Sequence, residues 1–138
     1  MNQEYQIAKV DKPEWEIIGG GIQQYNIQQA GDDKARSLCF VLKSPGQEIL
    51  GGLIGSTYWD WLHIDLMWIK EELRGRGYGQ RLLTLTEDEA RLRGAKNVYL
   101  DTFDFQAPDF YKRYGYQVFG ELSDFPNGHN RYFLTKKL

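Results

Sequence analysis

The stretch that decides the fold runs from residue 61 to residue 103 and reads WLHIDLMWIKEELRGRGYGQRLLTLTEDEARLRGAKNVYLDTF. Residues 61–69 are rich in apolar and aromatic side chains, which is typical of a buried strand. Residues 79–93 place leucines at 82, 83 and 85 and an alanine at 90 on one helical face, and Gly94 follows as the C-cap. Residues 97–103 again have the pattern of a strand. This order predicts a βαβ unit with two parallel strands.

The flanking sequence predicts antiparallel strands and two further helices. Residues 35–43 and 49–58 should form a meander with residues 61–69. A helix is expected from Pro13 to Ala30, although glycines at 19, 20 and 21 each cost about 1 kcal/mol relative to alanine. The remaining expected elements are a short first strand at 5–10, a short helix at 108–114, and strands at 116–121 and 131–136. The predicted fold class is therefore α+β: a mixed, mostly antiparallel sheet of about six or seven strands with one βαβ crossover, flanked by helices.

Length and composition limit the class of protein. The 138 residues suit one domain spanning the whole chain, 41% hydrophobic and 14% aromatic residues can fill a core, and a net charge of −2 gives no sign of nucleic-acid binding. No apolar stretch is long enough to cross a membrane and no signal peptide is visible, so we expect a cytoplasmic protein. The single cysteine, Cys39, lies in an apolar run and is predicted to be a buried thiol.

A loop rich in glycine and arginine joins the strand at 61–69 to the following helix, and it reads Arg74, Gly75, Arg76, Gly77, Tyr78, Gly79 and Gln80. Glycines let backbone N–H groups approach a ligand closely, and a helix start attracts anions, so the loop suits phosphates. A P-loop would need lysine and then serine or threonine after the last glycine, and neither is present. A dinucleotide fingerprint would need glycine at position 80. Two interpretations remain: the pyrophosphate of coenzyme A, and a turn with solvated arginines.

Two motifs resemble the signature blocks of the GNAT family of N-acetyltransferases. Residues 74–79 match R/Q-x-x-G-x-G/A, and residues 107–116, APDFYKRYGY, match A-x-x-x-Y-x-x-x-G-F/Y. The expected order of elements from residue 35 onward also agrees with that family. The resemblance implies transfer of an acetyl group to an amine, with acetyl-CoA as co-substrate and no metal.

The resemblance also implies a cofactor site. Backbone groups of the third strand would pair with the pantetheine arm, and loop amides would hold the pyrophosphate. The implied residues are Met67, Trp68, Ile69, Arg74, Gly75, Arg76, Gly77, Tyr78, Gly79, Gln80, Gln106 and Phe110. A strand bulge near Trp68 or Ile69 is expected to supply a backbone N–H to the oxyanion.

Three side chains are the candidate catalytic residues. Tyr111 matches the family tyrosine that protonates the departing thiolate, and its alternative role is packing of the short helix. His63 stands where many family members have a glutamate, and Asp65, two residues on, shares its face of the strand. Histidine titrates near neutral pH, and a carboxylate can orient it. We expect His63, oriented by Asp65, to act as the base. The alternatives are Asp65 itself, a water chain, and a pair that is purely structural.

The predicted acceptor is the primary amine of a small molecule. An aromatic and acidic cleft would suit a cation, and its candidate residues are Tyr58, Trp59, Asp60, Trp61, Phe103, Phe105, Asp124, Phe125, His129 and Asn130. The alternative place for these aromatics is the core. A protein N-terminus or lysine is the second candidate acceptor, and a non-catalytic CoA-binding sensor is a third function. An edge strand near the C-terminus could pair across a homodimer, an expectation from fold analogy alone.

Overall fold

The computed structural model describes residues 3–138. The chain divides into two compact units, Met1–Asp33 and Lys34–Leu138, which we call the N-terminal unit and the sheet unit. The N-terminal unit contains one helix, α1 (Trp15–Ala30), which confirms the predicted helix to within two residues of each end. Gly31 follows at a φ of +85°, and its N–H donates to the carbonyl of Ile27 at 2.8 Å. The strand predicted at residues 5–10 was wrong: a strand needs a ladder partner, and no described strand pairs with that segment.

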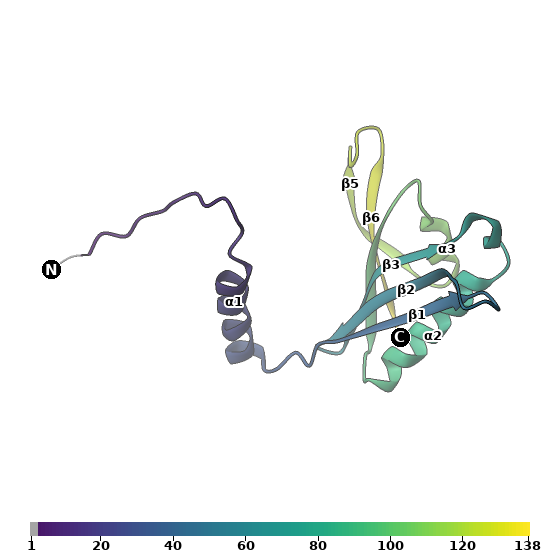
Figure 1. Ribbon diagram of the computed structural model, residues 1–138, viewed down its shortest axis with the longest axis horizontal. Helices are drawn as coiled ribbons and strands as arrows, with labels where there is room; N and C mark the ends of the chain where they lie inside the picture. The colour runs from purple at the N-terminus through teal and green to yellow at the C-terminus, as the bar shows by residue number, and fades with distance from the viewer. Residues whose placement is uncertain (1–2) are drawn as a thin grey trace. The chain divides into compact units, whose positions relative to one another are not determined.

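The sheet unit is built on one six-stranded sheet with the order β1-β2-β3-β4-β6-β5 (Figure 1). Its strands are β1 (Arg36–Lys43), β2 (Ile49–Tyr58), β3 (Trp61–Ile69), β4 (Asn97–Phe103), β5 (Gln117–Ser123) and β6 (Asn130–Lys137). All neighbouring pairs are antiparallel except β3 and β4, which are parallel. The predicted fold class and the βαβ crossover are therefore confirmed.

Helix α2 (Tyr78–Leu92) connects the two parallel strands and packs against β1, β2 and β3. Its buried side chains repeat with the helical period and are Leu82, Leu83, Thr86, Glu87 and Ala90. They meet the inward side chains of the strands, of which Leu53, Leu62, Val98, Leu100 and Leu134 are at most 1% exposed. A short 3-10 turn, η1 (Glu71–Leu73), precedes the glycine loop, and α3 (Pro108–Arg113) lies between β4 and β5.

One residue of β3 is extra relative to its partner β2. Ile54 pairs with Leu66 while Gly55 pairs with Ile64, so Asp65 has no opposite residue and forms a β-bulge. The bulge expected near Trp68 and Ile69 was therefore misplaced, since those two residues pair regularly with Gly52 and Gly51. The bulge shifts by one residue the alternation of side chains between the two faces of the strand. Leu62 and Ile64 face the core before it, and Met67 and Ile69 pack on the core after it.

The prediction of a buried Cys39 was also wrong, because its side chain is exposed. Leu38 takes the buried position, and the alternation of β1 turns the thiol to the other face. No helix among residues 3–138 is long and apolar enough to cross a membrane.

Candidate active site

The sheet opens between its two parallel strands. The ladder between β3 and β4 consists of three pairs, Trp61 with Asn97, Leu62 with Val98, and His63 with Tyr99. Beyond His63, β3 stays paired with β2 as far as Ile69, while β4 stays paired with β6 as far as Phe103. The carboxyl-terminal halves of the two strands therefore diverge and leave the facing edge of β3 without a β4 partner. An extended ligand can hydrogen-bond to such an edge.

The glycine loop lies at the end of this opening, where β3 leads through η1 into α2. Gly75 and Gly77 have φ values of +75° and +86°, a region that glycine enters without strain. Gly77 is the N-cap of α2, and no side chain caps the helix. The first turn of α2 also contains no acidic residue. Its N–H groups and its partial positive charge are thus available to an anion.

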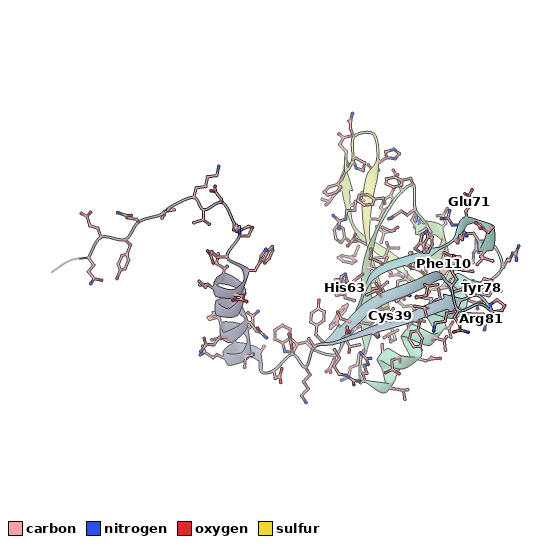
Figure 2. All side chains as sticks on the ribbon, viewed as in Figure 1. Cys39, His63, Glu71, Tyr78, Arg81 and Phe110 are labelled. Atoms are coloured by element: carbon pink, nitrogen blue, oxygen red, sulfur yellow. The ribbon has the colours of Figure 1, made fainter. Side chains whose placement is uncertain are left out.

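Arginine side chains and an aromatic ring complete the loop. The Nε of Arg74 donates to the carbonyl of Ile69 at 2.8 Å, which ties the loop to the end of β3. The guanidinium of Arg81 lies 5.8 Å from the ring centre of Tyr78. A Cβ added at Gly79 would lie 3.1 Å from the Phe110 ring, so a larger residue there would push the ring aside by a few tenths of an ångström. Figure 2 shows Tyr78, Arg81 and Phe110 at this end of the sheet unit.

The side chain of Tyr111 enters the core from α3. It is 6% exposed, and its ring makes edge contacts with Phe110 and Tyr116 at centroid distances of 5.2 and 5.6 Å. Burial raises the pKa of Tyr111 to about 12, because the phenolate is poorly solvated there. The hydroxyl therefore keeps its proton at neutral pH, as a proton donor must.

His63 and Asp65 form a close pair on the opposite face of the sheet. Nδ1 of His63 lies 2.5 Å from Oδ1 of Asp65, with the two side chains 27% and 42% exposed. Since a carboxylate only accepts hydrogen bonds, Nδ1 carries the proton and Nε2 is left as the basic nitrogen of the neutral ring. The structure therefore brings these two predicted residues together on one face of β3.

Tyr111 and the His63–Asp65 pair lie on opposite faces of the sheet. The neighbours of His63 in β3, Leu62 and Ile64, are buried in the same core cluster as Tyr111, whereas His63 projects the other way. His63 belongs to the last pair of the β3–β4 ladder, at the point where the opening begins. Such an arrangement allows proton removal on one face and proton donation on the other.

The other predicted cofactor residues lie around the opening or beyond it. Met67 and Ile69 pack on the core, whereas Trp68 is exposed on the other face. Gln106 uses its side-chain oxygen within the turn after β4, where it accepts from the Phe103 N–H at 2.8 Å and the Thr102 hydroxyl at 3.2 Å. Gln106 thus holds the end of the strand.

Aromatic residues predicted for the acceptor site do gather at the carboxyl end of β4. Phe103 stacks on Phe105 and contacts Phe125, with centroids 5.3 and 5.7 Å apart. The rings of His129 and Phe105 meet in a T-shaped contact, and Nδ1 of His129 lies 2.8 Å from Oδ1 of Asp104. The backbone N–H of Asn130 donates to the Asp104 carboxylate and, together with the side chain of His129, holds the pKa of Asp104 below its ordinary value. Trp61 instead lines an apolar recess of about 380 Å³, together with Tyr99, Phe119 and Thr135.

Several neighbours of this site were missed by the sequence analysis. Tyr99 stacks on His63. Arg131 donates to Asp101 through Nε and Nη2 at 2.9 and 2.7 Å, and the rings of Phe103, Phe125 and Phe133 surround its guanidinium at 5.0–5.5 Å. The only sequence signal was the alternation of β4, which puts Tyr99, Asp101 and Phe103 on the face away from the core.

Comparison with known proteins defines the class. The profile of the Acetyltransferase (GNAT) family matches residues 2–116. The chain is 42% identical to blasticidin-S acetyltransferase of Streptomyces morookaense over 92 residues, 66% of this chain and 68% of the relative. It is 34% identical to an acetyltransferase of Agrobacterium fabrum over 113 residues, 82% of each chain.

A solved structure agrees with this result. An acetyltransferase from Bacillus cereus has a TM-score of 0.90 to this structure at 36% identity, covering 97% of this chain and 98% of that one. The chain therefore belongs to the GNAT family of acetyltransferases, and it is an acyl-transferring enzyme.

Proposed function

We propose that this enzyme moves the acetyl group of acetyl-CoA to the primary amine of a small molecule. The observation that carries the proposal is the opening between β3 and β4, with the glycine loop at its end and the candidate base and acid on the two faces of the sheet. Blasticidin-S acetyltransferase, the relative at 42% identity, bears the name of a small-molecule substrate, which favours this acceptor class.

The cofactor would lie along the free edge of β3. Its pantetheine arm would hydrogen-bond to backbone groups of Met67, Trp68 and Ile69. The pyrophosphate would bind the N–H groups between Gly75 and Gln80 and the guanidinium groups of Arg74 and Arg76. Phe110 would pack beside the loop, because its ring already touches Gly79. When bound, acetyl-CoA supplies the activated acyl group.

The reaction would be a direct attack by the neutral amine. Nε2 of His63, with Nδ1 held by Asp65, would accept the amine proton while the nitrogen forms a bond to the thioester carbonyl carbon. Collapse of the tetrahedral intermediate breaks the carbon–sulfur bond and releases the thiolate. The buried Tyr111 hydroxyl would give its proton to the sulfur as this bond breaks.

The decisive experiment is a two-part assay of the whole chain. Calorimetry would measure acetyl-CoA binding, and a thiol-release assay would measure turnover with polyamines, aminoglycosides, nucleoside amines, aryl amines and peptides. We expect binding, and turnover with a small amine. Turnover confined to peptides would replace the acceptor by a protein N-terminus or lysine, and binding without turnover would indicate a CoA sensor. Absence of acetyl-CoA binding would overturn the proposal.

A further inference from the structure

The ring of Tyr99 lies flat against the imidazole of His63. The two ring centres are 4.5 Å apart and the planes differ by 22°. The two residues face each other as the last ladder pair before β3 and β4 diverge. The stack therefore stands at the apex of the opening.

Tyr99 is itself held by two neighbouring strands. Its hydroxyl is hydrogen-bonded to the hydroxyl of Tyr58, the last residue of β2. The Trp61 ring meets Tyr99 edge-on at a centroid distance of 5.9 Å. Burial, and then the bond to Tyr58, raise the pKa of Tyr99. The hydroxyl consequently stays protonated at neutral pH and the link to Tyr58 persists.

These contacts restrict the imidazole in two ways. Asp65 holds Nδ1, which fixes the tautomer, and the Tyr99 ring fixes the plane of the imidazole. Neither contact uses Nε2. We propose that Tyr99, anchored by Tyr58, is a positioning residue that keeps the His63 imidazole in register with Asp65. This inference rests on the proposed function, in which His63 is the base.

The stack also suits the charge that would form on His63. An imidazolium facing the π-surface of a tyrosine is stabilised, and the carboxylate of Asp65, with Oδ1 2.5 Å from Nδ1, stabilises it further. A base held in this way loses little orientation on accepting a proton, and small misplacements of catalytic groups cost large factors in rate.

Three variants of the full chain test the proposal. Tyr99→Leu removes the ring, Tyr99→Phe keeps the ring and removes the hydroxyl, and Tyr58→Phe removes the anchor without touching His63. Because the chain has only two histidines, ¹⁵N-labelled imidazole spectra at alkaline pH report the tautomer of each ring separately. His129, whose Nδ1 is held by Asp104, is the internal reference.

We expect wild-type His63 in the Nδ1–H tautomer. Tyr99→Leu should shift it toward the mixture of a free imidazole and lower kcat about tenfold, with acetyl-CoA affinity and His129 unchanged. Tyr99→Phe and Tyr58→Phe break the same hydroxyl link and keep the Tyr99 ring, so each should keep most of the tautomer preference and lower kcat about twofold to threefold.

An unchanged His63 tautomer in Tyr99→Leu would overturn the proposal, as would an unchanged kcat with chemistry rate-limiting. If Tyr99→Leu does not fold, wild-type behaviour of Tyr58→Phe and Tyr99→Phe in both readouts overturns it. Failure of the proposed function would appear separately, as absent turnover in the wild type, and the tautomer measurement would still decide whether Tyr99 positions His63.

Discussion

The hydroxyl of Tyr116 donates a 2.6 Å hydrogen bond to Oε2 of Glu87 in the core of the sheet unit. Tyr116 is 2% exposed and Glu87 is 6% exposed, so this contact joins two groups that have left water. Lys136 of β6 lies 3.0 Å from the same carboxylate oxygen. A buried carboxylate is costly unless it is paired and hydrogen-bonded. The three side chains therefore fix α2 against the C-terminal hairpin, next to Tyr111.

Neutralising this carboxylate should destabilise the fold. Glu87→Gln keeps the shape of the side chain but removes the charge that both Tyr116 and Lys136 face. We expect the free energy of unfolding to fall by about 1–3 kcal/mol in chemical denaturation. Glu89→Gln is the matched control on the same helix, where loss of the more exposed pair with Arg93 should cost under about 1 kcal/mol. Equal losses in the two variants would contradict the role of the Glu87 cluster.

Stability should decline at alkaline pH. Burial raises the pKa of Tyr111 to about 12, and burial together with the bond to Glu87 raises that of Tyr116. The folded state therefore holds these protons more tightly than the unfolded chain. The resulting stabilisation is complete below about pH 10, the ordinary tyrosine pKa, and is lost as the pH rises through the folded-state values.

For Tyr111 alone the loss approaches about 2–3 kcal/mol. Urea unfolding between pH 8 and pH 12 measures it, and Tyr111→Phe should show a shallower decline than the wild type. A slope identical in the two proteins would mean that Tyr111 does not contribute.

Tyr111→Phe should also lower turnover. The variant keeps the aromatic packing with Phe110 and Tyr116 but cannot protonate the thiolate. We expect kcat to drop about 10–100-fold with little change in acetyl-CoA affinity, since the proton is needed only in the transition state. Tyr114→Phe, three residues on in the same segment, is the control. Unchanged turnover with chemistry rate-limiting would remove Tyr111 from the mechanism.

The glycine loop offers a test of the anion site. Gly77 and Gly94 stand at the two ends of α2 with φ values of +86° and +91°, and an added Cβ would meet no atom within 4 Å at either position. Substitution by alanine should therefore lower the free energy of unfolding by a similar amount at both positions, about 1–2 kcal/mol, through backbone strain alone. Only Gly77→Ala should weaken acetyl-CoA binding, by about tenfold in calorimetry, because it disturbs the N–H groups at the helix start. Equal affinities in both variants would place the pyrophosphate elsewhere.

The proposed base can be identified from the pH dependence of activity. His63→Gln should lower kcat/KM by about 10²–10⁴-fold and flatten the acid limb of its pH profile. Asp65→Asn should have a smaller effect, since it disturbs only the partner of Nδ1. An unaltered acid limb in His63→Gln would point to Asp65 or to a water chain.

The local sequence pattern predicted most of the sheet unit, because each helix and strand has its own spacing of apolar residues. The bounds of β2, β3 and β4 agree with the prediction to the residue, since apolar runs there end at turn residues. Strand β5 starts one residue later and ends two residues later than predicted, and β6 is one residue longer at each end. Their extra residues, such as Ser123 and Asn130, are polar and are held by pairing with each other.

Positions within an apolar run were less predictable. Cys39 and Leu38 are equally apolar in sequence, and only the packing of β1 decided which of the two is buried. The bulge at Asp65 was missed for a similar reason. It appears only when the register of β3 against β2 is known.

What the amino-acid sequence determined by itself is the βαβ order, the glycine loop before α2 and the family motifs, because these depend on residues close together in the chain. What the tertiary structure decided is where β3 and β4 part, that Tyr99 covers His63, and that Tyr111 lies across the sheet from both. The physical reason is that strand register and side-chain stacking arise between residues some thirty-six positions apart, such as His63 and Tyr99. Such pairs are chosen by the packing of the whole sheet, and no local periodicity encodes them.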